Sequence, residues 1–186
     1  MNIKKIIVLD LDETLLFSSL QYQECSMKIW DYYVRFRPFL WDFLESLSWY
    51  YTIAIWSSAS ETYVHIIVKK IRELYWVDFL FVWGESYCSC SQKECIDLWY
   101  FLKNKKDLIK VVKKYQIPIG YILIVDDDPI KVNRNYGNAI YIDKYLWEND
   151  DNCLFLLKKY LFLIKDNNDF RSLEKRNWKS VVNNSF

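Results

Sequence analysis

Short apolar runs alternate along the chain with longer segments whose apolar residues recur at helical spacing. The short runs are rich in β-branched and aromatic residues, and they predict strands at residues 6–9, 51–56, 79–83, 122–125 and 139–142. The longer segments predict helices at residues 38–47, 61–74, 107–115 and 153–164. Strands that alternate with helices favour an α/β fold with a mainly parallel central sheet flanked by helices.

Other segments are less regular. Residues 17–36 are mixed and aromatic, a pattern that indicates a hairpin or flap. Pro38 is expected at the first position of the next helix, where its missing N–H costs nothing. Residues 84–104 are polar and cysteine-rich and then aromatic, and they predict no regular element. We expect one domain over residues 1–178, followed by a polar C-terminal tail at residues 179–186.

Three of the predicted strands end in polar residues that are able to do chemistry. Asp10 and Asp12 follow the first strand, Ser57 ends the second, and Asp126 and Asp127 follow the fourth. Because the carboxyl ends of parallel strands lie at one edge of a sheet, we expect these groups to meet there. Converging carboxylates repel one another unless a cation lies between them or they share a proton, and Mg²⁺ prefers such oxygen ligands. Taken singly, each acidic group also fits an ordinary solvated strand end or turn.

The serines and lysines near these acids have two interpretations each. Ser57 and Ser58 precede a predicted helix and fit a turn or a helix N-cap. The same position suits a hydroxyl that holds a phosphate oxygen at a helix start. Lys103, Lys105 and Lys106 fit a solvated surface, whereas one of them pointing inward would offset the charge of the carboxylates and of a phosphate.

Composition narrows the chemistry. The chain has 186 residues and a formal net charge of +1, which gives no electrostatic reason to expect a nucleic-acid partner. Its single histidine excludes a zinc site with several histidines, and its three widely spaced glycines exclude a glycine-rich phosphate loop. The five cysteines are odd in number and no secretory signal is recognised, so we expect reduced thiols and a cytoplasmic location.

Neither a membrane span nor a structural zinc site is expected. The late apolar stretch CLFLLKKYLFLI is too short to cross a bilayer and carries Lys158 and Lys159. Cys88, Cys90 and Cys95 are clustered, but no fourth ligand with suitable spacing accompanies them.

The segments DLDETL, IAIWSSAS, KDL and ILIVDDDP occur in the order of the four motifs of the haloacid dehalogenase (HAD) superfamily. Within it the chain resembles the small C-terminal-domain phosphatases of the NLI-interacting-factor (FCP/SCP) branch. RPFLWDFLESL is similar to an internal segment of that branch, and DFRSLEKRN is similar to its terminal helix. The resemblance covers residues 6–177. It implies a Rossmann-like HAD fold with a small flap and no large cap domain, and a phosphatase that requires Mg²⁺.

The resemblance also implies roles for the acidic residues. Asp10 would be the nucleophile that forms an aspartyl-phosphate. Asp12 would protonate the leaving oxygen and then deprotonate the attacking water. Asp10, the backbone carbonyl of Asp12, and Asp126 would hold Mg²⁺, with Asp127 in or near the coordination shell.

The remaining motif residues are expected to bind the substrate. Ser57, with Ser58 beside it, would bind the transferring phosphoryl group, and Thr14 would shape the loop that receives it. Lys106 would pair with the nucleophile and with the phosphate, and Lys105 is the alternative for this role.

The resemblance implies a phosphorylated protein as substrate, with phosphoserine or phosphothreonine as the first expectation. Members of the branch often carry an arginine after the third strand that helps to bind phosphoserine, but here that stretch reads FVWGESYCSC. A protein-tyrosine phosphatase therefore stays open as an alternative. Behind it come a phosphatase of small molecules or nucleotides, and an inactive binding module.

Overall fold

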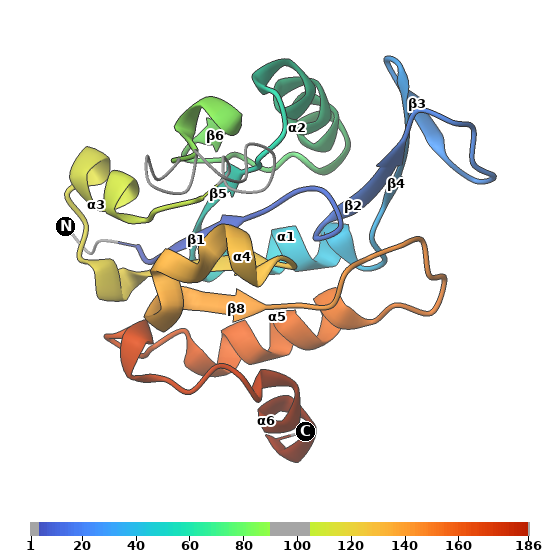
Figure 1. Cartoon of the computed structure of the whole chain (residues 1–186). Coiled ribbons are helices and arrows are strands. Elements are labelled where there is room, and N and C mark those ends of the chain that lie inside the picture. Colours follow the sequence, from blue (N-terminus) through green and yellow to red (C-terminus); the bar gives the residue numbers. More distant parts are fainter. Residues whose placement is uncertain (1–3, 90–104, 186) are drawn as a thin grey trace.

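The computed structural model describes residues 4–89 and 105–185, and it contains a five-stranded sheet in which every paired strand is parallel (Figure 1). The strands are β1 (Ile6–Leu9), β5 (Thr52–Trp56), β6 (Val82–Trp83), β7 (Ile122–Asp126) and β8 (Ala139–Tyr141). Their order across the sheet is β6-β5-β1-β7-β8. The prediction of an α/β fold with a parallel central sheet is confirmed.

Both faces of the sheet are covered by helices, which explains why β1 is a continuous apolar run rather than an alternating one. Ile7 and Leu9 pack into the core under α1 (Leu40–Tyr50), α2 (Glu61–Tyr75) and α5 (Cys153–Ile164). Ile6 and Val8 pack into the core under α3 (Ile109–Tyr115) and α4 (Pro129–Val132). The result is a three-layer arrangement with β1 at its centre.

The expected flap is a small antiparallel sheet that projects from the main body beyond β1 (Figure 1). Its strands are β2 (Leu16–Ser19), β3 (Met27–Ile29) and β4 (Tyr32–Phe36), in the order β2-β4-β3. Between Thr14 and Ser57, the chain contains only this flap, α1, β5 and their connections. That stretch therefore carries no cap domain.

The start of α1 differs from the prediction. The helix begins at Leu40 rather than at Pro38, because Phe39 adopts a left-handed conformation with φ of 65°. The N–H of Leu40 donates to the carbonyl of Arg37, and the Phe39 ring packs 5.5 Å from the ring of Phe155 on α5. A tight turn therefore replaces the expected first helical turn.

The third predicted strand is also shorter than expected. Only Val82–Trp83 form β6, although Leu80 and Phe81 each make one backbone hydrogen bond to β5. Most of the stretch that predicts no regular element, together with Cys90, Cys95 and Lys103, lies outside the described residues.

Short 3₁₀ turns connect several of these elements, at Glu85–Tyr87, Ile119–Tyr121, Asn133–Asn138 and Phe170–Ser172.

The C-terminal helix packs against α5. This last element, α6 (Trp178–Ser185), includes residues expected as a polar tail, yet Val182 is buried. The indole N–H of Trp178 donates to the carbonyl of Tyr141, at 3.0 Å. The division of the chain at residue 178 stays a prediction.

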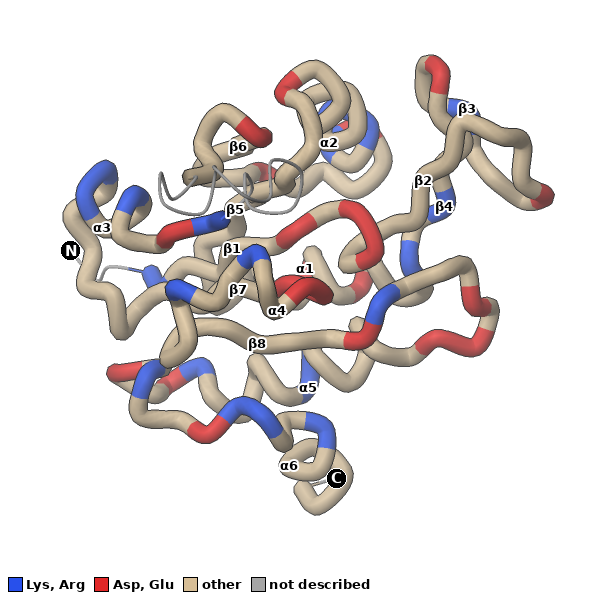
Figure 2. Tube along the Cα trace, in the orientation of Figure 1, with Lys and Arg blue, Asp and Glu red and all other residues tan. Residues whose placement is uncertain are grey.

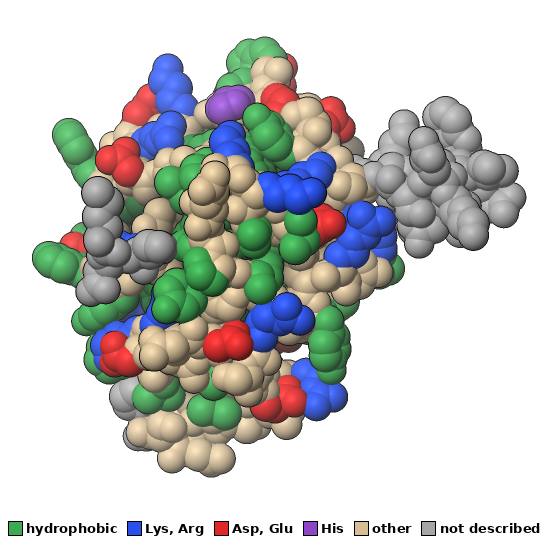
Figure 3. All heavy atoms as spheres, turned by 90° about the vertical axis from the view of Figure 1, so that its left-hand side faces the viewer, with side chains coloured by type: hydrophobic (Ala, Val, Ile, Leu, Met, Phe, Trp, Pro, Cys, Tyr) green, Lys and Arg blue, Asp and Glu red, His purple; other side chains and the backbone are tan. Residues whose placement is uncertain are grey.

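The described surface is mixed in character. On the face shown in Figure 3, basic, acidic and hydrophobic side chains are interspersed, in keeping with the formal net charge of +1. Within residues 4–89 and 105–185, no helix has both the length and the apolar character that a membrane span requires.

Candidate active site

The predicted polar strand ends do meet at one edge of the sheet. β1 lies between β5 and β7, with Leu9 in register with Ile55 on one side and with Val125 on the other. The N–H of Asp10 continues the ladder by donating to the carbonyl of Val125, at 3.1 Å. The strand order reverses between β1 and β7, the place where open α/β sheets bind ligands. Figure 2 shows acidic positions after β1 beside acidic positions at the start of α4.

Three buried carboxylates form the centre of this edge. Asp10, Asp126 and Asp127 each present an oxygen, and these oxygens all lie within 4.8 Å of one another. Burial, followed by the charge of Asp10, raises the pKa of both Asp126 and Asp127 above the ordinary value. Asp10 Oδ2 and Asp127 Oδ2 are buried without a hydrogen-bond partner among the described residues. Unpartnered buried oxygens on converging carboxylates fit the hard ligand set that Mg²⁺ prefers.

Lys106 neutralises part of this charge. Its ammonium lies 2.9 Å from Asp10 Oδ1 and 2.6 Å from Asp126 Oδ2, and the side chain is fully buried. Burial alone would lower the pKa of Lys106, but the charges of Asp10 and Asp126 outweigh it and raise the pKa. Asn135 orients the backbone by donating to the carbonyl of Lys106, at 2.6 Å. Lys105, in contrast, donates to the carbonyl of Ile130, at 3.0 Å.

The loop after β1 is held in a tight shape. Glu13 has a φ of 60°, a left-handed conformation that costs a non-glycine residue of order 1 kcal/mol and that surrounding contacts must maintain. One such contact is the hydrogen bond from the N–H of Tyr145 to the Glu13 carbonyl, at 2.7 Å. The buried hydroxyl of Thr14 donates to Asp127 Oδ1, at 3.1 Å. Thr14 thus ties the loop after β1 to the loop after β7.

Arg37, from the RPFLWDFL segment, also stabilises the loop after β1. Its guanidinium donates to the carbonyl of Thr14 at 3.0 Å, and to both oxygens of Asp151 at 2.8 and 2.7 Å. Burial opposes ionisation of the Asp151 carboxyl, but these hydrogen bonds and the charge of Arg37 lower its pKa. A bidentate pair of this kind fixes geometry as well as charge.

Asp12 lies in a different environment from the three central acids. The hydroxyls of Tyr63, on α2, and Ser18, on β2, both donate to Asp12 Oδ1, and their own oxygens lie 2.9 Å apart. Burial raises the pKa of Asp12 to about 6, although the hydrogen bond from Tyr63 opposes the shift. A carboxyl group with a raised pKa is suited to donate a proton near neutral pH.

Ser57 directly follows β5, at the same end of the sheet as Asp10. It is buried, its N–H donates to the carbonyl of Trp83, and its hydroxyl oxygen accepts from the N–H of Ala59, at 3.0 Å. The N-cap of α2 is Ser60, whose side chain accepts from the N–H of Tyr63. Ser57 is therefore not the helix cap, and Ser58 follows it half-buried.

Asp128 belongs to the fold rather than to the acidic cluster. Its side chain accepts from the N–H of Ile130, at 2.8 Å, and so caps α4. Pro129 occupies the first helical position, where it needs no hydrogen-bond partner. The three adjacent acids thus divide into two that face the site and one that caps a helix.

Three residues at the site were not expected from the sequence. The ammonium of Lys131 lies 3.6 Å from Asp10 Oδ2, and that of Lys144 lies 2.6 Å from Glu13 and 3.5 Å from Asp127. The third is Tyr63, which donates to Asp12. It lies among the buried apolar residues of α2, so the sequence pattern predicts a core residue rather than a site residue. The only sequence signal for Lys131 is its place two residues after the Asp-Asp-Asp-Pro segment.

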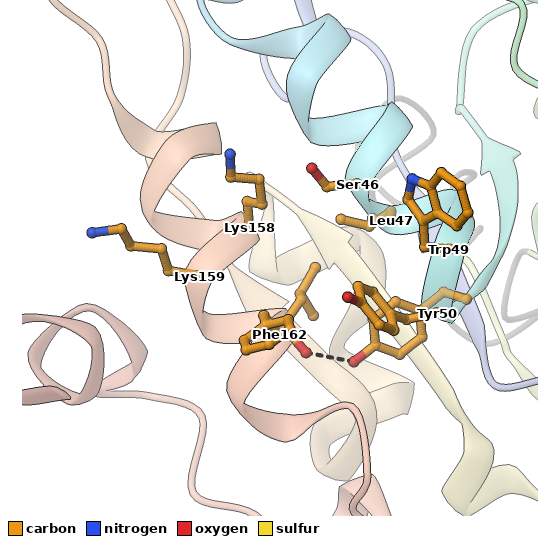
Figure 4. Close-up of a pocket in the computed structure, with 9 residues that line it drawn as sticks. Ser46, Leu47, Trp49, Tyr50, Lys158, Lys159 and Phe162 are labelled. Carbon is orange, nitrogen blue, oxygen red and sulfur yellow. Dashed lines mark hydrogen bonds between the residues drawn. The ribbon is translucent and has the colours of Figure 1, made fainter. Parts of the chain in front are cut away.

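A separate apolar pocket lies between α1 and α5, away from these residues (Figure 4). Its volume is about 290 Å³. Trp49 and Tyr50 of α1 and Phe162 of α5 line it. Tyr51 and Leu161 line it too, and the hydroxyl of Tyr51 donates to the carbonyl of Leu161, at 2.6 Å. No residue of the acidic cluster contributes to its wall.

The chain is similar to known proteins over most of its length. The CTD phosphatase-like protein 355R of Invertebrate iridescent virus 3 is 27% identical over 182 residues, covering 84% of this chain and 94% of the viral protein. Nuclear envelope morphology protein 1 of Saccharomyces cerevisiae is 22% identical over 185 residues, covering 91% of this chain but 41% of the yeast protein.

Solved structures share the fold. The RNA polymerase II CTD phosphatase Fcp1 of fission yeast, in its R271A form bound to beryllium fluoride, superposes with a TM-score of 0.58 at 15% identity. The match covers 97% of this chain and 62% of the Fcp1 chain, so this chain spans less than two thirds of that neighbour. A protein from Listeria monocytogenes serotype 4b superposes with a TM-score of 0.55 at 18% identity, covering 87% of this chain.

A model of the NLI interacting factor-like phosphatase family matches residues 5–171, which include every strand and helix that builds the site. The resemblance of the motifs to this branch is thereby confirmed. The chain belongs to the NLI interacting factor-like phosphatase family and is a phosphoric monoester hydrolase.

Proposed function

We propose that the chain is a Mg²⁺-dependent phosphoprotein phosphatase that works through an aspartyl-phosphate on Asp10, with phosphoserine and phosphothreonine as its first substrates. One observation carries the proposal. Lys106 bridges Asp10 and Asp126, while the facing oxygens of Asp10 and Asp127 have no hydrogen-bond partner in the described chain. The cluster therefore brings together the proposed nucleophile, a fixed positive charge and carboxylate oxygens suited to a hard cation.

In the first half-reaction, a carboxylate oxygen of Asp10 attacks the phosphorus atom of the phosphomonoester. A new bond joins that oxygen to phosphorus, and the bond from phosphorus to the ester oxygen breaks. Asp12, whose pKa is raised to about 6, donates its proton to the departing oxygen. The buried ammonium of Lys106 stabilises negative charge on the phosphoryl group because it is already in place before the reaction.

In the second half-reaction, Asp12 accepts a proton from a water molecule, whose oxygen then attacks phosphorus. The bond between Asp10 and phosphorus breaks, inorganic phosphate leaves, and both carboxyl groups return to their starting state. Asp12 serves both steps because Tyr63 and Ser18 hold one of its oxygens and leave the other for proton transfer. Ser57 is proposed to hold the phosphoryl group from the β5 side, with Ser58 and Thr14 shaping the surrounding loops.

The residues suited to hold Mg²⁺ are Asp10, Asp126 and Asp127, together with the backbone carbonyl of Asp12. When bound, the ion would supply positive charge to the phosphoryl oxygens and relieve the repulsion among the carboxylates. Within the protein, Thr14 fixes the orientation of Asp127 and Lys106 fixes that of Asp126.

The architecture around the site supports a macromolecular substrate. The chain between Thr14 and Ser57 supplies a small flap rather than a domain that would close over the site. The viral relative is named a CTD phosphatase-like protein, and Fcp1 is named an RNA polymerase II CTD phosphatase. A phosphoprotein is therefore the substrate class that the site and its relatives favour together.

Hydrolysis of p-nitrophenyl phosphate tests the mechanism. We expect Mg²⁺-dependent turnover that a chelator abolishes and that Asp10→Asn eliminates. Asp128→Asn is the matched control, because it changes a neighbouring carboxylate that only caps α4, and asparagine is an equally good cap. Wild-type turnover in Asp10→Asn, or full activity with chelator present, would refute the mechanism.

A panel of peptides with one sequence, phosphorylated on serine, threonine or tyrosine, tests the substrate class. We expect the largest kcat/KM for phosphoserine or phosphothreonine. A clear preference for phosphotyrosine would replace the proposed substrate without changing the mechanism. Hydrolysis confined to nucleotides or small esters would overturn the assignment of a protein substrate.

A further inference from the structure

Lys131 is a second lysine at the nucleophile, and the mechanism above makes no use of it. Its ammonium lies 3.6 Å from Asp10 Oδ2, the oxygen that accepts no hydrogen bond from the described residues. Lys106 contacts the other oxygen, Oδ1, at 2.9 Å. The carboxylate of Asp10 is therefore flanked by two ammonium groups, one at each oxygen.

The backbone holds the two lysines in a fixed relation. The N–H of Lys106 donates to the carbonyl of Lys131 at 2.8 Å, and the side chain of Lys105 donates to the neighbouring carbonyl of Ile130. The N–H of Lys131 donates to the carbonyl of Asp128. The base of the Lys131 side chain is thus anchored to the segment that carries Lys106, while its ammonium extends into the site.

Lys131 and Lys106 differ in how accessible they are. The side chain of Lys106 is fully buried, whereas that of Lys131 is 26% exposed. A separation of 3.6 Å is too long for a hydrogen bond, so Asp10 attracts the Lys131 ammonium without using its donors. An ammonium that donates no hydrogen bond within residues 4–89 and 105–185, partly open to solvent and next to the nucleophile, is able to bind an anion that arrives at Asp10.

Charge explains why the site needs a second lysine. An arriving phosphate dianion meets Asp10, Asp126 and Asp127, which repel it when ionised. Lys106 and one divalent cation together balance these three charges and leave the dianion without net attraction. Lys144 is less suited to help, because it is 54% exposed and already paired with Glu13 at 2.6 Å.

We propose that Lys131 binds the phosphoryl group of the substrate at the Oδ2 side of Asp10. The inference rests on the proposed phosphatase function and adds a substrate-binding residue to it. Lys131 then adds a phosphate contact at Oδ2 of Asp10, while Lys106, at Oδ1, keeps its role of stabilising charge on the phosphoryl group during its transfer.

Calorimetric titration of inorganic phosphate into the Mg²⁺-loaded protein tests the proposal without turnover. We expect Lys131→Met to weaken phosphate binding by about 10- to 100-fold, the effect of losing a charge-assisted hydrogen bond. Lys131→Arg should retain affinity within about threefold, since arginine keeps the charge and the donors. Lys113→Met, which removes one exposed lysine from α3, is the control for net charge and should bind phosphate like the wild type.

Turnover of p-nitrophenyl phosphate supplies a second readout. For Lys131→Met we expect KM to rise by the same factor as the phosphate Kd, with a smaller change in kcat. Equal phosphate affinity in Lys131→Met and the wild type would overturn the role of Lys131 while leaving the phosphatase proposal intact. A loss of affinity that disappears at saturating Mg²⁺ would also overturn it, because Lys131 would then act on the metal. A wild-type protein that neither binds phosphate nor hydrolyses the ester would overturn both.

Discussion

The hydroxyl of Tyr63 donates a hydrogen bond to the carboxylate of Asp12, although 51 positions separate the two residues in the sequence. Burial, together with the charge of Asp12, raises the pKa of Tyr63, so the phenol stays protonated and remains a donor. Ser18 reaches the same carboxylate oxygen from the flap strand β2. The orientation of the proposed acid thus depends on helix α2 and on the flap together.

Tyr63→Phe should lower kcat/KM more for substrates whose leaving group must be protonated than for substrates whose leaving group departs as a stable anion. We expect kcat/KM to fall about tenfold or more for a phosphoserine peptide, whose alkoxide leaves poorly, and less for p-nitrophenyl phosphate. Tyr32→Phe is the control, because the Tyr32 ring packs against that of Tyr63, with centroids 4.7 Å apart. An equal loss on both substrates would indicate structural damage rather than a misplaced acid.

The raised pKa of Asp12 should make the metal-free protein sensitive to pH. The ordinary carboxyl value is 3.8 and the folded value is about 6, so the native state binds this proton more tightly than the unfolded chain does. Stability from this group is therefore present at low pH and is lost as pH rises from about 4 to about 6.

Urea unfolding of the wild type and of Asp12→Asn, each at pH 4 and pH 6.5, measures this linkage. Because asparagine does not titrate, the free-energy difference between the two proteins should shift by roughly 2–3 kcal/mol between the two pH values, in favour of the variant at the higher pH. A difference that stays constant would contradict the raised pKa.

Lys106→Met should impair both folding and catalysis. It leaves Asp10 and Asp126 buried without their counter-charge, a change that typically costs about 3–5 kcal/mol at neutral pH. Turnover should fall by roughly 10²–10³-fold, as when one fixed donor is removed from a transition state. Thermal melts and kinetics check both effects. Lys105→Met removes an ammonium that donates to the Ile130 carbonyl, and this variant should keep most of the activity. The opposite ranking would assign the motif lysine to Lys105.

Arg37→Met should destabilise the protein without changing any group proposed to react. The substitution leaves Asp151 and the carbonyl of Thr14 without their shared partner, at a cost of about 3–5 kcal/mol. For a chain of this size, that corresponds to a midpoint lower by roughly 10 °C. Arg176→Met breaks an exposed pair with Glu174 and should leave the midpoint nearly unchanged. Similar melting of both variants would contradict the structural role of Arg37.

The sequence predicts the parallel sheet and the meeting of its polar strand ends because both follow from general rules of topology. The three neighbouring strands β5, β1 and β7 are parallel and in register. That arrangement alone brings their carboxyl ends together, with Asp10, Ser57 and Asp126. Their individual roles stay proposals.

Other features could not be predicted, because the same residue type at the same spacing fits either an ordinary structural position or a site position. Tyr63 sits in an apolar helical stripe that also suits a core residue, and Lys131 looks like any exposed lysine near a helix start. The short start of α1 depends on the left-handed conformation of Phe39, which is not a property of its residue type. Only tertiary contacts decide these cases.

Both ends of the flap are tied to the loop after β1, one through the chain and the other through hydrogen bonds of Arg37. β2 begins at Leu16, two residues after Thr14, and β4 ends at Phe36, next to Arg37. The N–H of Arg37 also donates to the carbonyl of Leu15, at 2.9 Å. The flap is therefore fixed at both of its ends to the segment that carries Asp12 and Thr14. A partner that binds the flap would therefore act on the orientation of Asp12, the proposed proton donor, through Ser18 of β2.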